Sequence, residues 1–491
     1  MTKTIVLISF IAFAALYSNA QTKIFKEVDG EVLSQMRTIR QDNILIGYLV
    51  FTQLEKATED SFNYRITILD ENLNDIGTVN FRQLKLDLQA VAFEQDVLCL
   101  GYLKTNLIGY TFKSKQEFRA ALDSNQTAIY TQFIGLDGKI IKTNSVAANI
   151  TIADAKDEWW VRAVDAWGIL HNTIQLQNIS ETGFACFYGD RRNHLMVFDT
   201  KGNVLWKKQV TEETDGYKWD RWHIGAVYMA TFGNNIYLIS NKYEWGHSKP
   251  QSGMFNFELL GFSAIDTTKQ LQYPLSDEKD NQLRLFYFKN DPSTGKPCIT
   301  GMIANKNEKF LGVCTITIGG LTSSDVHWVN SYWDDDIFDA PADSKSIKKD
   351  ISDLAVKYSF RGFNGHSYFT AYTYASGSEF MEQNEKGMLS VKSNILSESD
   401  LHPKPLPFHK NDNDNRSFYS IVSADAKICY LIVDDPRTVS IYNVNQQKVQ
   451  RTIPHKDGDT KITVFPAKDG YIMVSEYNKK EKYTKFSIEA L

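Results

Sequence analysis

A strand unit recurs along the whole of this chain and constrains its fold more than any other feature. The most recognisable part of the unit is a turn followed by an apolar strand. Eight copies of this part occur: DNILIGYLV from Asp42, DVLCLGYL from Asp96, GFACFYG from Gly183, NNIYLIS from Asn234, GKPCITG from Gly295, GHSYFTAYTY from Gly365, AKICYLIV from Ala426 and GYIMVSEY from Gly470. Short apolar or alternating runs between turn residues are typical of β-strands.

A second strand follows each copy and often ends in an acidic turn. These strands are YRITILD from Tyr64, IYTQFIGLDG from Ile129, HLMVFDTKG from His194, LLGFSAID from Leu259, GVCTITIGG from Gly312, GMLSVKSN from Gly387, TVSIYNVN from Thr438 and KYTKFSIEA from Lys482. Most copies have one more strand before the apolar strand and another after a tight turn. Repeated four-stranded antiparallel units are typical of propeller blades. The sequence therefore predicts an all-β fold, a single β-propeller of eight four-stranded blades, with seven blades as the alternative.

The two ends of the chain predict how the ring closes. The last copy ends at its third strand, because the chain stops at Leu491. The segment from Lys23 to Val28 lies outside the first unit. We expect it to supply the missing outer strand of the last blade, because such pairing removes an exposed sheet edge.

Two hairpin turns have a composition that specifies their geometry. Asp137-Gly138 is a strong hairpin signal, and Asp199-Thr200-Lys201-Gly202 suits a type I turn with its glycine in the left-handed conformation. The hairpin VFDTKGNVLW, from Val197 to Trp206, resembles the blade hairpins of quinoprotein-like and other secreted propellers. This resemblance implies a secreted propeller family without an assigned function. Because the hairpin departs from the quinoprotein docking motif and from the sialidase Asp-box, it implies neither a quinone cofactor nor sialidase activity.

The N-terminus predicts export from the cytoplasm. Lys3 precedes an apolar run from Ile5 to Leu16, and Ser18-Asn19-Ala20 matches a signal peptidase site. This run is shorter than the roughly 20 residues that span a bilayer, and no later segment is apolar enough to span one. We expect a signal peptide over residues 1–20 and a propeller domain over residues 21–491, located in the periplasm or outside the cell.

Charge, cysteine and histidine content narrow the classes of function. The formal net charge of −5 argues against a nucleic-acid partner, which needs a basic surface. Cys99, Cys186, Cys298, Cys314 and Cys429 all lie inside apolar strand-like runs. We expect them to be small buried hydrophobic residues, although one disulfide stays open in an oxidising compartment. No histidine pair has zinc-ligand spacing and no Gly-rich phosphate loop follows a strand, so we predict no metal, no cofactor and no catalytic residue.

The long insertions are expected to gather at one end of the propeller. In a blade, the turns from the first to the second strand and from the third to the fourth lie at one end, and the other connections lie at the opposite end. The short turns belong to the first class and the long insertions to the second.

Seven of the nine tryptophans lie in the insertions: Trp159, Trp160, Trp167, Trp219, Trp222, Trp245 and Trp333. Loops on a rigid scaffold often carry binding residues and tryptophan is enriched at binding hot spots, so we expect this end to bind a protein or a glycan. Packing of the tryptophans onto the ring is the structural alternative.

Two insertion segments hold the remaining candidate binding residues. Trp219-Asp220-Arg221-Trp222-His223 has the side chains to stack a sugar ring or hold a carboxylate, and a packed loop ion pair is the simpler interpretation. Trp333-Asp334-Asp335 offers carboxylates next to an aromatic ring, and solvated loop charges are the simpler interpretation there.

The leading functional hypothesis is a non-enzymatic binding or scaffold propeller that uses these two segments together with Trp159, Trp160 and Trp245. The alternative is a carbohydrate-active enzyme, a glycoside hydrolase or lyase, that uses Asp220, Asp334 and Asp335. Nothing in the sequence specifies the oligomeric state.

Overall fold

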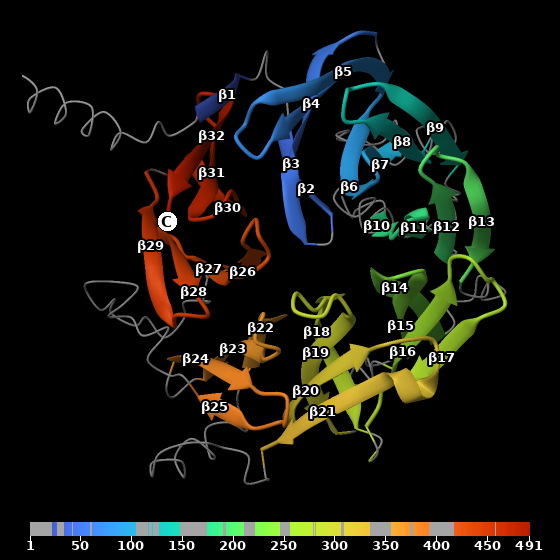
Figure 1. The fold of residues 1–491 in the computed structure, drawn as a ribbon, viewed down its shortest axis with the longest axis vertical. Coiled ribbons are helices and arrows are strands. Elements are labelled where there is room, and N and C mark those ends of the chain that lie inside the picture. The colour runs from blue at the N-terminus through green and yellow to red at the C-terminus, as the bar shows by residue number, and fades with distance from the viewer. Residues whose placement is uncertain are drawn as a thin grey trace, which may run out of the picture.

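A computed structural model describes residues 22–26, 34–41, 43–58, 61–104, 116, 120, 127–147, 174–189, 193–210, 221–245, 256–277, 279, 281–305, 309–333, 355–373, 377–391, 417–456 and 458–491. Eight four-stranded antiparallel sheets form a ring, and each sheet is one blade (Figure 1). This arrangement confirms the all-β propeller prediction and shows eight blades, not seven.

Within each blade the strands are named A to D from the axis of the ring outward. Blades 1 to 4 consist of β2 (Ser34–Gln41), β3 (Ile44–Lys56), β4 (Ser61–Asp70) and β5 (Asp75–Leu84); β6 (Leu86–Glu94), β7 (Val97–Lys104), β8 (Ala128–Gly135) and β9 (Ile140–Ala147); β10 (Gln175–Ile179), β11 (Gly183–Gly189), β12 (Asn193–Asp199) and β13 (Val204–Gln209); and β14 (Arg221–Phe232), β15 (Asn235–Trp245), β16 (Asn256–Ser263) and β17 (Gln270–Pro274).

Blades 5 to 8 complete the ring. They consist of β18 (Gln282–Asn290), β19 (Pro297–Ala304), β20 (Phe310–Ile318) and β21 (Val326–Tyr332), with a short 3-10 helix over Ser323–Asp325; β22 (Ala355–Arg361), β23 (Ser367–Thr373), β24 (Gly377–Gln383) and β25 (Leu389–Val391); β26 (Ser417–Val422), β27 (Cys429–Asp434), β28 (Thr438–Asn443) and β29 (Lys448–Pro454); and β30 (Thr460–Pro466), β31 (Tyr471–Asn478), β32 (Tyr483–Ala490) and β1 (Thr22–Lys26).

The ring closes through the N-terminal strand, as the sequence predicts. β1 pairs antiparallel with β32, and its register runs from Thr22 opposite Ser487 to Lys26 opposite Tyr483. The ring of Phe25 packs edge-on against Phe486 at a centroid distance of 5.4 Å. The first strand in the chain is therefore the outermost strand of the last blade, and blade 8 joins the two ends of the sequence.

The hydrophobic core lies between the blades, with one cluster of buried side chains between each neighbouring pair. A strand in the middle of a blade contributes one face to each of two clusters, which explains its continuous apolar sequence. In β7, all six residues between Val97 and Lys104 are buried. The outer strand β9 alternates between exposed and half-buried residues instead. Burial on both faces therefore distinguishes the central strands of a blade from its outer strand.

All five cysteines are buried and free, which confirms that they act as small hydrophobic residues. Burial raises the pKa of the Cys186, Cys298 and Cys429 thiols to about 12, so these thiols stay protonated at neutral pH. No helix within the described segments is long and apolar enough to cross a membrane.

Blade 6 differs from its prediction. The sequence suggests GMLSVKSN, from Gly387, as strand C, but strand C is β24 (Gly377–Gln383) and the residues after Gly387 form the short outer strand β25. The charged residue Glu382 makes the sequence of β24 unlike that of an apolar inner strand. In the fold this carboxylate is satisfied by neighbours, because it lies 2.6 Å from His366 Nδ1 and accepts a hydrogen bond from the Tyr368 hydroxyl at 3.0 Å.

The predicted turn of blade 3 has the expected glycine conformation. Gly202 has φ +77°, its amide donates to the Asp199 carbonyl, and Asp199 Oδ1 accepts from the Asn203 amide at 2.7 Å. Gly138 in blade 2 has φ +81°. A Cβ on Gly202 would also lie 2.7 Å from the Phe133 ring of blade 2, so this turn requires glycine for space as well as for φ.

Replacing Gly202 by alanine is expected to lower the free energy of unfolding by about 2 kcal/mol, because left-handed strain and the contact with Phe133 add together. Gly470 is the matched control, because it has φ +75° and nothing within 4 Å of its Cβ position. Its replacement by alanine should cost only the conformational part, about 1 kcal/mol. Chemical denaturation measures both losses, and equal losses would contradict the steric contribution of Phe133.

The two ends of the ring differ as the sequence predicts. The A–B and C–D turns are short and lie at one end, which we call the short-turn rim. The opposite end, the insertion rim, receives the B–C and D–A connections, because the strands that flank them end there. The longest of these connections span residues 105–127, 148–174, 333–354 and 392–416.

Candidate functional sites

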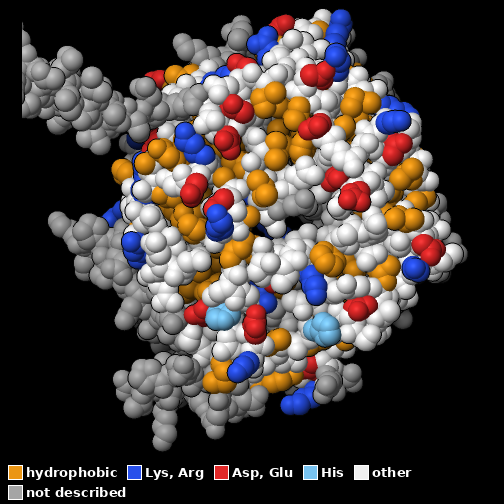
Figure 2. All heavy atoms as spheres, in the orientation of Figure 1, with side chains coloured by type: hydrophobic (Ala, Val, Ile, Leu, Met, Phe, Trp, Pro, Cys, Tyr) orange, Lys and Arg blue, Asp and Glu red, His pale blue; other side chains and the backbone are white. Residues whose placement is uncertain are grey.

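The central channel holds a pocket of about 940 Å³ (Figure 2). Its walls are the ends of the innermost strands of the blades together with residues of the A–B turns, such as Asn43 and Gly233, so it lies at the short-turn rim. Apart from two tyrosines and a cysteine, the polar and charged lining residues are Thr38, Arg40, Asn43, Gln177, Asn178, Ser180, Thr231, Lys289, Asn290, Arg361, Ser420 and Thr463. Among the described residues that line the pocket there is no aspartate, glutamate or histidine.

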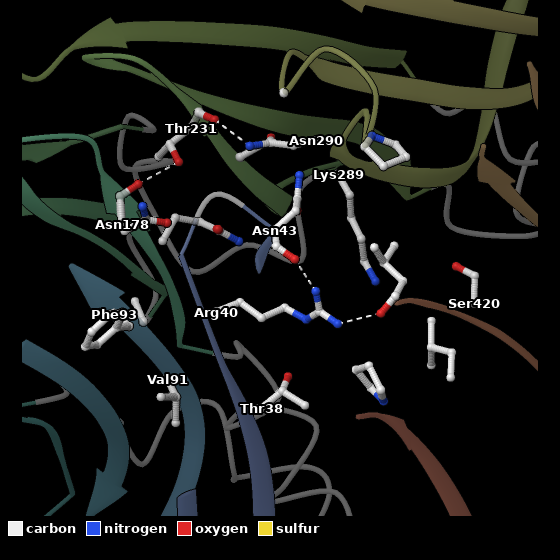
Figure 3. A pocket seen from close by; sticks show the side chains of 18 of the residues that line it. Thr38, Arg40, Asn43, Val91, Phe93, Asn178, Thr231, Lys289, Asn290 and Ser420 are labelled. Carbon is white, nitrogen blue, oxygen red and sulfur yellow. Dashed lines mark hydrogen bonds between the residues drawn. The ribbon is translucent and has the colours of Figure 1, made fainter. Parts of the chain in front are cut away.

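Arg40 crosses from blade 1 to blade 7 at the pocket wall. Its guanidinium donates to the backbone carbonyl of Asn43 and, at 2.6 Å, to the carbonyl of Val422 (Figure 3). Burial lowers the pKa of Arg40 to about 10, which leaves the group charged at neutral pH. The two carbonyls orient the guanidinium but bring no negative charge to balance it.

Lys289 extends into the pocket from the end of strand A in blade 5 (Figure 3). Its side chain is open to solvent within the pocket, yet the surrounding walls desolvate the ammonium and lower its pKa below the usual value. Within the described part of the chain its Nζ forms no hydrogen bond or ion pair, and it lies 6.0 Å from the centre of the Tyr287 ring. Lys289 is thus a second cation without a carboxylate partner.

Arg361, the third cation of the lining, is neutralised. Its Nε donates to Asp291 Oδ2 at 2.8 Å, and only 9% of the arginine side chain and 1% of the aspartate side chain are exposed. Asp291 Oδ1 in turn accepts from the amide and the hydroxyl of Ser293. This buried ion pair joins blade 5 to blade 6 at the edge of the pocket.

A chain of buried hydrogen bonds continues from this ion pair between the two blades. Arg361 Nη1 donates to the Ser367 hydroxyl at 3.0 Å, and the Ser367 and Thr315 hydroxyls lie 2.6 Å apart. Thr315 donates to Gln383 Oε1, and Gln383 Nε2 donates to the Ser331 hydroxyl, both at 2.6 Å. Buried polar groups of this kind need every partner, so the chain fixes how the two blades face each other.

Hydrogen bonds from side chains of the pocket wall also connect the inner strands of blades 2 to 5. Thr231 Oγ1 donates to the Asn178 carbonyl at 2.7 Å, and Asn290 Nδ2 donates to the Thr231 carbonyl at 2.8 Å (Figure 3). Asn178 Nδ2 donates to Glu94 at 3.1 Å. These side chains hold the inner strands of blades 2 to 5 together, which leaves the two unbalanced cations as the most distinctive chemical feature of the pocket.

Several candidate residues from the sequence fall outside the described segments. They are Trp159, Trp160, Trp219, Asp220, Asp334 and Asp335. Their role in partner binding stays a prediction.

The structure corrects the expected loop character of Arg221, Trp222, His223 and Trp245. These residues belong to β14 and β15, whose ladder extends to the insertion rim. Arg221 pairs with Trp245, Trp222 with Glu244, and His223 with Tyr243. The structure thus brings together two segments that the sequence treats as separate insertions.

Trp333 is part of the core at the insertion rim. Only 7% of the residue is exposed, and it packs with Met302, Val313 and Phe369 between blades 5 and 6. Its backbone amide donates to the Leu311 carbonyl at 2.8 Å. For this tryptophan the structure supports the packing alternative: it anchors the start of the connection to blade 6.

The cations of the pocket were missed by sequence reasoning, although a weak signal exists. Arg40, Lys289 and Arg361 each occupy one of the last two positions of strand A in their blades, in RTIRQ, FYFKN and KYSFR. A basic residue at one of the last two positions of an inner strand is a usable signal once the blade register is known.

Comparisons with known proteins do not show the activity of this chain. Residues 1–167 match the model of a family described as "Family of unknown function (DUF6770)". No curated protein sequence matches the chain.

Solved structures with a similar architecture are distant in sequence. The Dos1 propeller is 10% identical, with a TM-score of 0.47 over 95% of this chain and 93% of its own. The β-propeller domain of Cps50 (Swd1) from Myceliophteria thermophila is 7% identical, with a TM-score of 0.39 over 95% of this chain and 99% of its own. A puromycin-hydrolyzing peptidase from Mycobacterium tuberculosis is 6% identical, with a TM-score of 0.40 over 83% of this chain and 53% of its own. The strand topology therefore identifies the chain as an eight-bladed β-propeller, of which residues 1–167 match the family of unknown function DUF6770.

Proposed function

We propose that this protein is an exported, non-enzymatic binding propeller that engages a protein or a glycan through its insertion rim. The observation that carries the proposal is the β14–β15 hairpin. At this rim its ladder joins Arg221 to Trp245 and Trp222 to Glu244, and its strands are longer than their counterparts in most blades. A two-stranded ribbon on a rigid ring whose sequence contains tryptophan, arginine and histidine suits recognition by stacking and charge-assisted hydrogen bonds.

The asymmetry of the ring supports the same proposal. The longest connections join strand ends at the insertion rim, whereas short connections join the described strands at the short-turn rim. Export rests on the N-terminal segment, where Lys3, an apolar run and Ser18-Asn19-Ala20 follow one another. The alternative, a carbohydrate-active enzyme, depends on Asp220, Asp334 and Asp335, and all three lie outside the described residues.

Site-specific photo-crosslinking in the full-length chain tests the proposal. A benzoylphenylalanine at Glu244, on the β15 side of the hairpin, is expected to form adducts with a protein or glycan in the producing cell. The same probe at Lys201, in the exposed C–D turn of blade 3, should form none, because this turn lies at the short-turn rim. Adding Trp222→Ala to the Glu244 probe should reduce the adduct yield at least about tenfold if this tryptophan is a hot spot.

Two outcomes would count against partner binding at this rim. One is an equal adduct yield from the Glu244 and Lys201 probes. The other is no adduct from Glu244 together with no glycan retained by the intact protein on a glycan array. An undiminished yield with Trp222→Ala would remove this residue from the contact surface.

A further inference from the structure

The charge of the central pocket is opposite to that of the chain as a whole. The chain carries 59 acidic and 54 basic residues. The described lining of the pocket nevertheless contains Arg40, Lys289 and Arg361 and no acidic residue. Since Asp291 neutralises Arg361, two positive charges remain unbalanced in the pocket.

Both remaining cations are partly desolvated: Arg40 is half-buried, and the pocket walls desolvate the Lys289 ammonium although its side chain is open to solvent. Burial is the main cause that lowers the pKa of Arg40 and the only cause that lowers the pKa of Lys289. A cation in such surroundings gains more from a bound anion than a surface cation does, because solvent screens the attraction less. No described side chain of the pocket thus supplies a negative charge that balances these two cations.

The donor groups are free to bind. Arg40 uses its two bonds to the Asn43 and Val422 carbonyls to fix its orientation, and a guanidinium has five N–H donors, so further donors remain. Lys289 has three donors, none of which is used within the described part of the chain. Figure 3 shows both side chains directed toward the same part of the pocket.

We propose that the pocket binds a small organic anion whose carboxylate or phosphate group is held by Arg40 and Lys289. The volume of about 940 Å³ is at the upper end of the usual range for small-molecule sites and far exceeds the needs of an inorganic ion. Phe93, Phe232 and Ile421 supply apolar wall for the remainder of the molecule. The site lies at the short-turn rim, so it does not depend on partner binding at the insertion rim.

Isothermal titration of the intact protein with citrate and with inorganic phosphate, at constant ionic strength in sodium chloride, tests this site. We expect saturable one-to-one binding of at least one of the two anions. Citrate binding alone would indicate a carboxylate ligand, and phosphate binding would indicate a phosphate-bearing one. Lys289→Gln should raise the dissociation constant at least about tenfold, because it removes a charge-assisted hydrogen bond.

Lys201→Gln is the matched control, because it removes the same charge from an exposed turn at the same rim. Its dissociation constant should stay within about twofold of that of the unmodified protein. Lys289→Gln should unfold no earlier than the unmodified protein, because Lys289 has no described partner to lose. The proposal is overturned if neither anion binds, or if the two lysine variants weaken binding equally. Either result leaves the crosslinking test at the insertion rim unaffected.

Discussion

Replacing Arg361 by methionine should destabilise the propeller by about 3–5 kcal/mol, the largest loss expected from any single change considered. Its Nε donates to Asp291 Oδ2 at 2.8 Å, in a pair of which the aspartate side chain is 1% exposed. Methionine fills similar space but leaves this carboxylate buried without its cation. Ser367 Oγ also loses its Arg361 donor, so the chain of hydrogen bonds between blades 5 and 6 loses its first link.

Chemical denaturation followed by fluorescence measures this loss, and hydrogen exchange locates it. Protection should fall first in β18 and β22, because Asp291 directly follows β18 and Arg361 is the last residue of β22. Arg451→Met is the matched control, because Arg451 also pairs with a carboxylate, Glu489, but both side chains are 25–29% exposed. Solvent screens such a pair, so the control should lose about 1 kcal/mol or less. Similar losses in the two variants would mean that burial does not increase the contribution of the Asp291–Arg361 pair to the free energy of unfolding.

Deleting residues 21–26 is expected to lower the free energy of unfolding by about 3 kcal/mol and to promote self-association. The deletion removes the five paired positions of β1 and the contact between Phe25 and Phe486. It also removes the ion pair between Lys23 and Asp75, which ties β1 to blade 1 at 2.5 Å. The edge of β32 then becomes available to another chain, as unpaired strand edges generally are.

Two point variants separate packing from backbone pairing in this strand. Phe25→Ala should lose part of the stability, whereas Ile24→Ala should change it little, because Ile24 is 55% exposed. Denaturation midpoints and light scattering after gel filtration measure the stability and the mass of each variant. A deleted chain with an unchanged midpoint and an unchanged mass would show that β1 does not close the ring in solution.

The elements that could be predicted from the sequence are those specified by neighbouring residues. The B strands are recognisable because both of their faces are buried between blades, as the six buried residues inside β7 illustrate. The left-handed conformation of Gly202 follows from Asp199-Thr200-Lys201-Gly202 itself. β24 was missed because Glu382 is satisfied by Tyr368 of β23 and by His366, which directly precedes β23.

The sequence by itself determined the propeller fold, the closing strand and the burial of the cysteines, because each is encoded in a local pattern of apolar and turn residues, and it left eight or seven blades open until the structure showed eight. Only the tertiary structure decided that Arg40 and Lys289 line one pocket and that Arg221 lies opposite Trp245. Arg40 and Lys289 are far apart in the chain, and no local pattern relates them. They meet because closure of the ring brings the ends of all the inner strands to one axis.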